Sequence, residues 1–418
     1  MPHRCAAALV VATWAALCVA REAPAEPPLV WDVPTGSTLP LATLRDERAG
    51  SDALFVAHKA GGLAVWSLAV SPPVEVARLA ASAFGGLHVV HLAQRGDRLF
   101  VALGDPFALA GSRAGLAVVD VADPAAPAHL DQWTSSGVVC GASDVEVSDA
   151  AIYLGAMGLG VVVLTFDGVA LREETTVVPG GGTPSCGFLA PNVRGLFLAG
   201  DRLYVGNDGG GLVVLDASAP TAPVEIGAYA NPALGGKPQA YNHVVVDGAL
   251  AYAAVDYCGL EILDVADPAA IAPVGWWNPW GCETPANVWF DSPGHANEIA
   301  LDAARRRVVL SAGDSEVLVV DVSDPANPAL VDAVGAPGNG RGVWGVELEG
   351  NVAVATYIVA AIPFQGGVNA VRAFDLPEPA AARGAVAALG ALAWVARARR
   401  RVRSARARVR VRGSLPSR

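Results

Sequence analysis

Gly211-Leu212-Val213-Val214-Leu215-Asp216 is the stretch that decides the fold, because the pattern Gly-Leu-x-Val-x-Asp recurs along the chain. Six further copies, some of them weaker, begin at Gly62, Gly115, Gly160, Gly259, Glu316 and Ala370. The starts of the seven copies lie about 51 residues apart on average. A repeat of this length indicates one supersecondary unit that is used again and again, with neighbouring units burying a common core.

Each repeated unit holds four short segments rich in β-forming residues. In the unit around the quoted stretch, the predicted strands are Gly195–Leu198, Leu203–Val205, Leu212–Leu215 and Val224–Ile226. The segments between them are rich in Gly, Asp, Asn and Pro, which favour tight turns. Short strands with tight turns and no helical period exclude a βαβ fold. The sequence therefore predicts an all-β fold, a seven-bladed β-propeller with four-stranded antiparallel blades.

The two ends of the repeat region predict how the ring closes. The seventh copy ends at Asp375 and has no segment left for an outer strand. Leu29–Val33 precedes the first unit and has no partner segments of its own. We expect this N-terminal segment to supply the outer strand of the last blade, which removes two exposed sheet edges. The alternative is a loose leader after the signal segment.

Four of the seven copies continue into a second phrase. It reads Asp-Val-Ala-Asp-Pro-Ala-Ala-Pro from Asp120, and similar versions begin at Asp216, Asp264 and Asp321. This phrase resembles the LVIVD repeat, a bacterial β-propeller family, over about residues 42–375. The resemblance implies a propeller outside the cytoplasm and no defined reaction. Because the Asp of each Asp-Pro recurs with the blade, we interpret it as a turn cap and not as a catalytic acid.

The N-terminal residues 1–25 are predicted to be a secretory signal. Arg4 provides the positive start, and Cys5–Ala20 is a 16-residue apolar run, which is short for a membrane span. Small residues follow at Cys18-Val19-Ala20 and again at Ala23-Pro24-Ala25. A lipoprotein or an uncleaved anchor helix are the alternatives. Residues 26–376 are then the propeller.

The C-terminal residues 377–418 have three parts. Pro377-Glu378-Pro379 comes first, Gly384–Ala396 is an apolar run, and an Arg-rich tail starts at Arg397. This order resembles the PEP-CTERM sorting signal of Gram-negative bacteria. The resemblance implies recognition by sorting machinery, membrane contact through this segment only, and display at the cell surface or release. A plain C-terminal anchor, or a basic tail that binds anionic lipid, is the alternative.

Composition excludes several classes of protein. The chain has 418 residues, of which 53% are hydrophobic and 17% charged, so it is not disordered. Its net charge is −11, and ten arginines with no acidic residue follow Ala396, so residues 1–396 carry −21. Such a surface repels phosphates, which excludes nucleic acid as a partner.

Four cysteines remain after the signal segment, at Cys140, Cys186, Cys258 and Cys282. Cys140 and Cys186 precede the innermost strands of consecutive blades. Cys258 and Cys282 lie in two kinds of loop that open on the same face of a propeller. Both pairings are therefore allowed, and an oxidising compartment favours them, with free thiols as the alternative. No zinc-type spacing is present, and the sequence predicts neither a metal nor a cofactor.

The central mouth of the ring is one candidate site. The loops that enter the innermost strands end in polar residues, and the alignment of the blades places Asp144, Arg194, His243 and Glu298 near the axis. Carboxylates with a histidine and an arginine suit a general acid, a base and an anion clamp. The alternative is a wet channel whose polar residues bond one another and water.

The longest insertion is the second candidate site. It runs from Trp276 to Trp289 and holds four tryptophans, which are Trp276, Trp277, Trp280 and Trp289. Aromatic side chains stack on sugars and mark protein interfaces. Trp344, Tyr241 and Asn242 complete the predicted binding residues. The alternative is that Trp276 and Trp277 alternate across a strand and pack between blades.

No sequence motif identifies a reaction: zincin, serine-hydrolase, phosphate-loop and EF-hand patterns are all absent. The sequence therefore favours an exported, non-catalytic module that binds or organises a surface protein or an extracellular polysaccharide. The alternative function is a lactonase-like hydrolase or lyase that uses the four mouth residues. A quinone-dependent dehydrogenase fits less well, because the blades lack a repeated tryptophan docking motif.

Overall fold

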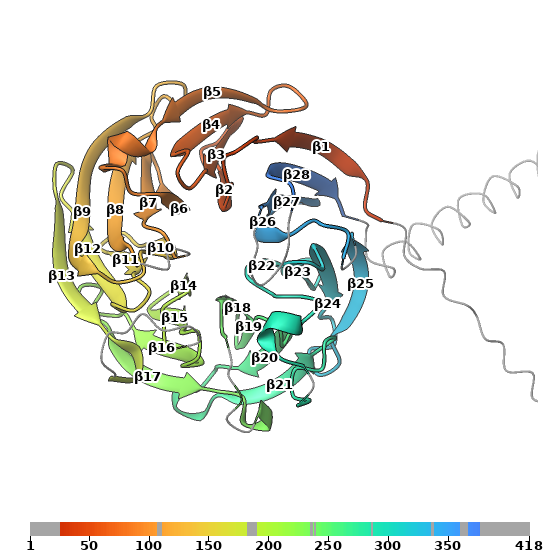
Figure 1. Ribbon diagram of the computed structural model, residues 1–418. Helices are drawn as coiled ribbons and strands as arrows, with labels where there is room; N and C mark the ends of the chain where they lie inside the picture. Colours follow the sequence, from red (N-terminus) through yellow and green to blue (C-terminus); the bar gives the residue numbers. More distant parts are fainter. Residues whose placement is uncertain are drawn as a thin grey trace, which may run out of the picture.

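The chain folds into seven four-stranded antiparallel sheets arranged as blades around a central axis (Figure 1). A computed structural model describes residues 26–106, 111–181, 190–234, 237, 240–285, 287–335, 338–359 and 367–376. The predicted signal segment (residues 1–25), the predicted sorting segment (residues 377–418) and Cys186 lie outside the described residues. None of the helices in the described ranges has the length and apolar character that a membrane span requires. The predicted seven-bladed propeller is confirmed.

The first four blades follow the order of the chain. Blade 1 contains β2 (Ala42–Arg45), β3 (Ala53–Ala57), β4 (Leu63–Ser67) and β5 (Val74–Leu79). Blade 2 contains β6 (Val89–Arg95), β7 (Arg98–Leu103), β8 (Arg113–Asp120) and β9 (Ala128–Val138). Blade 3 contains β10 (Asp144–Val147), β11 (Ile152–Gly155), β12 (Val161–Phe166) and β13 (Leu171–Val177). Blade 4 contains β14 (Gly195–Ala199), β15 (Arg202–Gly206), β16 (Leu212–Asp216) and β17 (Val224–Tyr229).

The remaining three blades complete the ring. Blade 5 contains β18 (His243–Asp247), β19 (Leu250–Ala254), β20 (Leu260–Asp264) and β21 (Ala272–Trp277). Blade 6 contains β22 (Ile299–Asp302), β23 (Arg307–Ser311), β24 (Val317–Asp321) and β25 (Ala329–Val334). Blade 7 contains β26 (Val343–Glu349), β27 (Val352–Tyr357), β28 (Ala370–Asp375) and β1 (Leu29–Pro34). Short 3-10 turns are η1 (Ala81–Phe84), η2 (Pro179–Gly181), η3 (Pro232–Leu234), η4 (Pro268–Ala270) and η5 (Trp289–Asp291).

The N-terminal strand closes the ring, as predicted. β1 pairs antiparallel with β28 and so becomes the outer strand of the last blade (Figure 1). The Arg372 guanidinium on β28 lies 3.1 Å from the Asp32 carboxylate on β1 and stacks 4.5 Å from the centre of the Tyr357 ring. The two ends of the repeat region are thus held together by backbone pairing and by a largely buried cation.

The core lies between the blades, because the middle strands bury both faces. β3 and β7, for example, carry Phe55 and Val101 at 0% exposure, and both belong to one cluster that spans blades 1 and 2. Burial of an apolar side chain of this size stabilises the fold by about 1.5–3 kcal/mol. The alternating apolar residues of the repeated phrase therefore hold each blade against its neighbours.

The Asp-Pro phrase shapes the turn between the third and fourth strands. Asp123, Asp267 and Asp324 each accept a hydrogen bond from the backbone N–H two residues later, at 3.0–3.2 Å. The expected role as a turn cap is confirmed. Two of these turns also pack on the preceding blade: a Cβ at Gly227 would lie 1.8 Å from the Pro268 carbonyl oxygen, so only glycine fits there.

Candidate functional site

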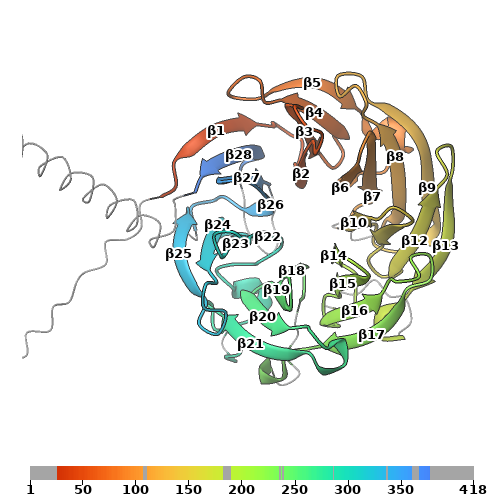
Figure 2. The same cartoon turned by 180° about the vertical axis from the view of Figure 1, so that it is seen from behind.

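One position of the innermost strand is directed at the axis in every blade. His91 on β6 pairs with Ala102, Asp144 on β10 pairs with Gly155, and His243 on β18 pairs with Ala254. Glu298 occupies the equivalent position before β22. The other three blades carry small residues there, which are Ala42, Gly195 and Gly345. The inner strands surround the axis in both views of the ring (Figure 2).

The four predicted mouth residues meet in one cavity. Asp144, Arg194, His243 and Glu298 all line it, together with Trp344 and other residues. His91 lines the same cavity, and the sequence reasoning missed it. A shift of register between Val89 and His91 explains this omission, because the extra residue moves His91 out of line with the loop ends of the other blades.

The Asp144 carboxylate connects four blades. Oδ1 lies 2.6 Å from His91 Nδ1 of blade 2, and Oδ2 lies 3.3 Å from His243 Nε2 of blade 5. Oδ2 also accepts a 2.6 Å hydrogen bond from the Leu196 N–H of blade 4. Gly195, next to Leu196, lets blade 5 approach closely, because a Cβ there would lie 2.6 Å from the His243 ring. Asp144 is 2% exposed, so its carboxylate is a buried point of contact between blades. We refer to this point of contact as the Asp144 joint.

Other axial carboxylates join the remaining blades. Glu298 Oε2 accepts a 3.2 Å hydrogen bond from the Val346 N–H, which connects blade 6 to blade 7. Glu347 Oε1 accepts a 2.7 Å hydrogen bond from the Arg45 N–H, which connects blade 7 to blade 1. The innermost strand of a blade has no sheet partner on its axial side, so its N–H groups need acceptors. These carboxylates supply them.

The charges of the mouth are set by burial and by one another. Burial alone would raise the pKa of Asp144, but the charge of His91 and hydrogen bonds from His243 and His91 lower it overall. Burial opposes protonation of His91, yet the Asp144 charge raises its pKa to about 9. Burial raises the pKa of Glu298, and burial together with the Asp144 charge raises that of Glu146 to about 8. Asp144 is therefore ionised, His91 is protonated and Glu146 favours the neutral form, whereas for Glu298 burial shifts the balance toward the neutral form.

The mouth cavity is small. Its volume is about 30 Å³, which holds one or two water molecules. The separation of His243 and Asp144 would suit acid–base chemistry, but the carboxylate already has bonding partners in three other blades. The arrangement can hold and orient a small polar group. It has no room for a lactone ring or a sugar.

The tryptophans of the insertion are partly buried and pack against the blades. Trp276 packs with the core between blades 4 and 5 and donates a 2.9 Å hydrogen bond to the Cys258 carbonyl. Trp277 and Trp280 pack with the core between blades 5 and 6. Trp289 donates a 2.9 Å hydrogen bond to the Asp256 carboxylate and lies edge-on to the His295 ring. The alternation of Trp276 and Trp277 across β21 is the packing alternative foreseen from the sequence.

The other predicted binding residues also have internal contacts. Tyr241 is fully buried, and its hydroxyl donates a 2.6 Å hydrogen bond to Glu261. Asn242 is 4% exposed and donates a 2.9 Å hydrogen bond to the Ala296 carbonyl, which connects blade 5 to blade 6. Trp344 lies at the mouth, where its ring stacks under the Arg194 guanidinium at 5.6 Å.

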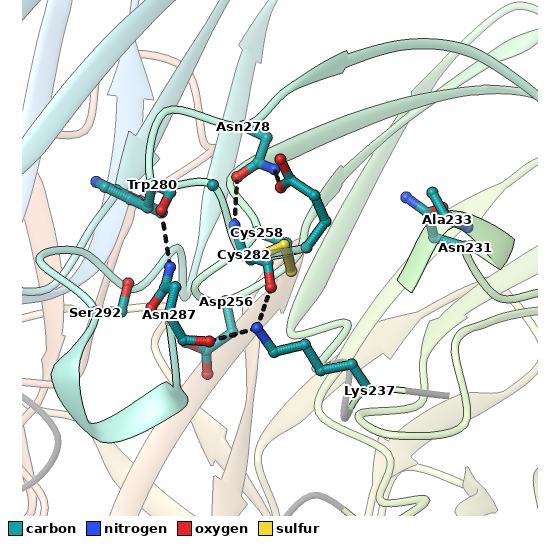
Figure 3. Close-up of a disulfide and its surroundings, with 12 residues drawn as sticks. Asn231, Ala233, Lys237, Asp256, Cys258, Asn278, Trp280, Cys282, Asn287 and Ser292 are labelled. Carbon is teal, nitrogen blue, oxygen red and sulfur yellow. Dashed lines mark hydrogen bonds between the residues drawn. A yellow bond between two sulfur atoms is a disulfide. The ribbon is translucent and has the colours of Figure 1, made fainter. Parts of the chain in front are cut away.

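A disulfide fixes the insertion to its blade. The predicted bond between Cys258 and Cys282 is present, and it joins the turn after β19 to the loop after β21 (Figure 3). The Lys237 ammonium donates hydrogen bonds to the carbonyls of Cys282 and Asn287 (Figure 3), and a third to the Thr284 carbonyl. Asn287 in turn donates a 2.9 Å hydrogen bond to the Trp280 carbonyl. The disulfide and these hydrogen bonds therefore tie the insertion to its blade, although it has little regular secondary structure.

The rigid insertion presents two apolar side chains at its surface. Phe290 is 61% exposed and Val288 is 44% exposed. They flank Trp289, whose ring meets that of Phe290 edge-on at 4.9 Å. We refer to Val288 and Phe290 as the tip of the insertion. The sequence analysis emphasised tryptophans and overlooked this tip, because only the structure separates exposed aromatic residues from packed ones.

Within the described ranges, no three side chains of His, Cys, Asp or Glu are grouped in a way that would hold a metal ion. The pairing predicted for Cys140 involves Cys186, which the structure does not describe.

Comparisons with known proteins agree with the repeat and with the fold. The LVIVD repeat model matches residues 101–132, 192–231, 240–278 and 311–335. These are the four units that carry the second phrase. The comparison with curated proteins gives no match.

Solved propellers are similar in shape and distant in sequence. The RRP9 WD40 repeats align over 84% of this chain and all of that one, with 13% identity and a TM-score of 0.59. The Cps50 (Swd1) β-propeller domain of Myceliophteria thermophila covers the same shares, with 12% identity and a TM-score of 0.55. Saccharomyces cerevisiae Sqt1 also covers these shares, with 8% identity and a TM-score of 0.56. Such likeness shows the fold alone. The chain is thus a seven-bladed β-propeller that carries LVIVD repeats.

Proposed function

We propose that this protein is an exported, non-catalytic binding module that captures a protein partner at the bacterial cell surface through the tip of its insertion. The observation that carries this proposal is a rigid loop with exposed apolar side chains. Phe290 and Val288 are exposed, although the segment around them is held by the disulfide and by Lys237. A preorganised loop loses little entropy on binding, and an aromatic anchor is typical of protein interfaces.

Two features support export. The Cys258–Cys282 disulfide is stable in an oxidising compartment and is rarely kept in the cytosol. Residues 1–25 have the composition of a secretory signal, and residues 377–418 resemble a surface-sorting signal. Together they favour the cell surface or the extracellular space of a Gram-negative bacterium.

The state of the mouth supports a non-catalytic role. Asp144 and Glu298 accept hydrogen bonds from backbone N–H groups of neighbouring blades. The cavity between them has a volume of about 30 Å³, which leaves no room for a lactone ring or a sugar inside it. The main expected effect of removing either carboxylate is therefore a weaker ring, not the loss of a catalytic group.

A photo-cross-linking experiment tests the proposal. A benzophenone amino acid is placed at Phe290 in one variant of the full chain and at Val169, which is 79% exposed on a distant turn, in the control. Illumination on the producing cell should give one discrete protein adduct at position 290 and none at position 169. Equal adducts at both positions would contradict the proposal. A saturable polysaccharide ligand whose binding requires Phe290 would replace the protein partner with a glycan.

A further inference from the structure

Three side-chain groups that line the mouth cavity have no partner in the protein. The Arg194 guanidinium makes no ion pair and donates no hydrogen bond to any described residue, and it lies over the Trp344 ring. The Asn297 side-chain nitrogen is buried without a hydrogen-bond partner, and so is His243 Nδ1. Asn297 is only 6% exposed.

Unpaired buried donors are rare, because each one costs free energy that the fold must recover elsewhere. Arg194 and Asn297 have only donors to offer at these atoms. The protein thus provides several hydrogen-bond donors around one small space. A ligand that complements this set supplies acceptors.

The charges around the cavity also favour a ligand that supplies acceptors and carries a negative charge. Arg194 and His91 are cationic, and Asp144 is the ionised acid. The Asp144 charge is compensated by His91 at 2.6 Å and shared with His243 at 3.3 Å. Burial makes the neutral form of Glu298 more favourable, which limits its repulsion of an anion. The Arg194 guanidinium therefore has no ion pair with any described residue, although its charge opposes the burial that raises the pKa of Asp208 to about 7.

We propose that the mouth is a binding site for a single carboxylate group, held by Arg194 and Asn297 above the Asp144 joint. A carboxylate is planar, and it matches the fork of a guanidinium with two parallel hydrogen bonds. The cavity of about 30 Å³ admits a group of this size and excludes a larger body, which must remain outside the mouth. A phosphate or sulfate dianion is disfavoured, because its second charge would face the ionised Asp144 carboxylate.

This site is separate from the tip of the insertion, so it does not depend on the proposed protein partner. The carboxylate can belong to a free small acid, or it can be the acidic group of a larger molecule that rests on the rim. The group that binds is a carboxylate in both cases. The two sources are distinguished by which probe binds more tightly.

Titration with sodium acetate tests the proposal. The full chain is titrated while tryptophan fluorescence is recorded, because an acetate bound to Arg194 changes the contact with Trp344. Ionic strength is held constant with chloride. We expect a saturable change for the wild type, at least tenfold weaker affinity in Arg194→Gln, and an intermediate affinity in Arg194→Lys. Arg172→Gln is the matched control, since its side chain is 77% exposed on an outer strand.

Other ligands and a second variant test which chemical group the mouth binds. Phosphate should bind more weakly than acetate, and glucuronate and a short acidic peptide identify the source of the carboxylate. Asn297→Ala should weaken acetate binding about tenfold or less while preserving the fold, as followed by thermal melting. Equal binding of acetate to the wild type and Arg194→Gln would overturn the proposal. Absence of any saturable change would show that the cavity holds only water, and tighter binding of phosphate would replace the carboxylate with a dianion.

Discussion

The axial mouth and the disulfide-tied insertion both carry residues of the kind that catalysis and binding use, yet the fold employs them differently. At the axis, Asp144 and Glu298 bond backbone groups of neighbouring blades. In the insertion, the tryptophans pack inward, and Phe290 remains exposed. The difference teaches that residue type alone does not identify a site. What identifies it is a group left without a protein partner, such as Arg194 at the mouth.

The largest effect is expected for Asp144→Ala. The substitution leaves protonated His91 and the Leu196 N–H without their buried acceptor. Breaking a buried charge pair from one side costs about 3–5 kcal/mol, so the free energy of unfolding should fall by that amount. Equilibrium denaturation in urea measures it. Asp247→Ala, an exposed residue at the end of β18, should change the free energy by less than about 0.5 kcal/mol.

Loss of the disulfide should have the second-largest effect. The bond closes a loop with a sequence separation of 24 residues, and a bond of this kind stabilises a protein by about 2–4 kcal/mol. The double variant Cys258→Ala/Cys282→Ala should lose that stability and also capture the partner less well, since the tip becomes less ordered. A reducing agent should bring the wild type close to the variant. If the oxidised wild type and the variant unfold together, the insertion is held mainly by Lys237 and packing.

Stability should fall as the pH rises above neutrality. The pKa of His91 is raised from 6.5 to about 9, so its stabilising contribution is complete below about pH 6.5 and is lost as the pH rises to 9. Glu146 acts in the same direction, because its pKa is raised to about 8. The His91 share of this decrease in unfolding free energy should be about 2–3 kcal/mol between pH 6.5 and 9.

The variant His91→Gln checks the origin of this pH dependence. It should have a much flatter profile over the same range, whereas His129→Gln, on the outer strand β9, should keep the slope of the wild type. Because Glu146 contributes to the same slope, only a slope in His91→Gln as steep as that of the wild type would assign the effect to the axial glutamates instead of the histidine.

The smallest effect on stability is expected at the tip. Phe290→Ala removes a side chain that is 61% exposed, so the unfolding free energy should change by less than about 0.5 kcal/mol. Partner capture should nevertheless be lost, which separates binding from folding. If the Phe290→Ala variant captures the partner as well as the wild type does, the tip is excluded as the contact. Thermal melting of the same sample verifies that the variant is folded.

Most of the fold could be predicted from the sequence because the blades of a propeller repeat the same sequence pattern. Seven copies of one phrase determined the blades, and the missing outer strand assigned Leu29–Val33 to the last blade. The predicted strands of blade 4 differ from the observed ones only at their ends: Leu203–Val205 becomes Arg202–Gly206. The Cys258–Cys282 bond followed from the loop geometry that a propeller imposes.

The site was only partly predictable, for physical reasons. Repeat spacing brought Asp144, Arg194, His243 and Glu298 together, but His91 was missed because a local irregularity in β6 shifts its register. Which donors remain unpaired depends on side-chain geometry that no spacing encodes. The same holds for the tip, since Trp289 and Phe290 are adjacent in sequence and differ in exposure.

A double-mutant cycle between Asp144 and His243 tests the central claim that the axis is a joint between blades. The two residues belong to blades 3 and 5, which are not neighbours, and their side chains lie 3.3 Å apart across the mouth. Unfolding free energies are measured for Asp144→Ala, His243→Ala, the double variant and the wild type. A coupling of about 1–3 kcal/mol is predicted, because residues in one buried network are not additive. Additive effects would show that the axial residues do not hold the ring together.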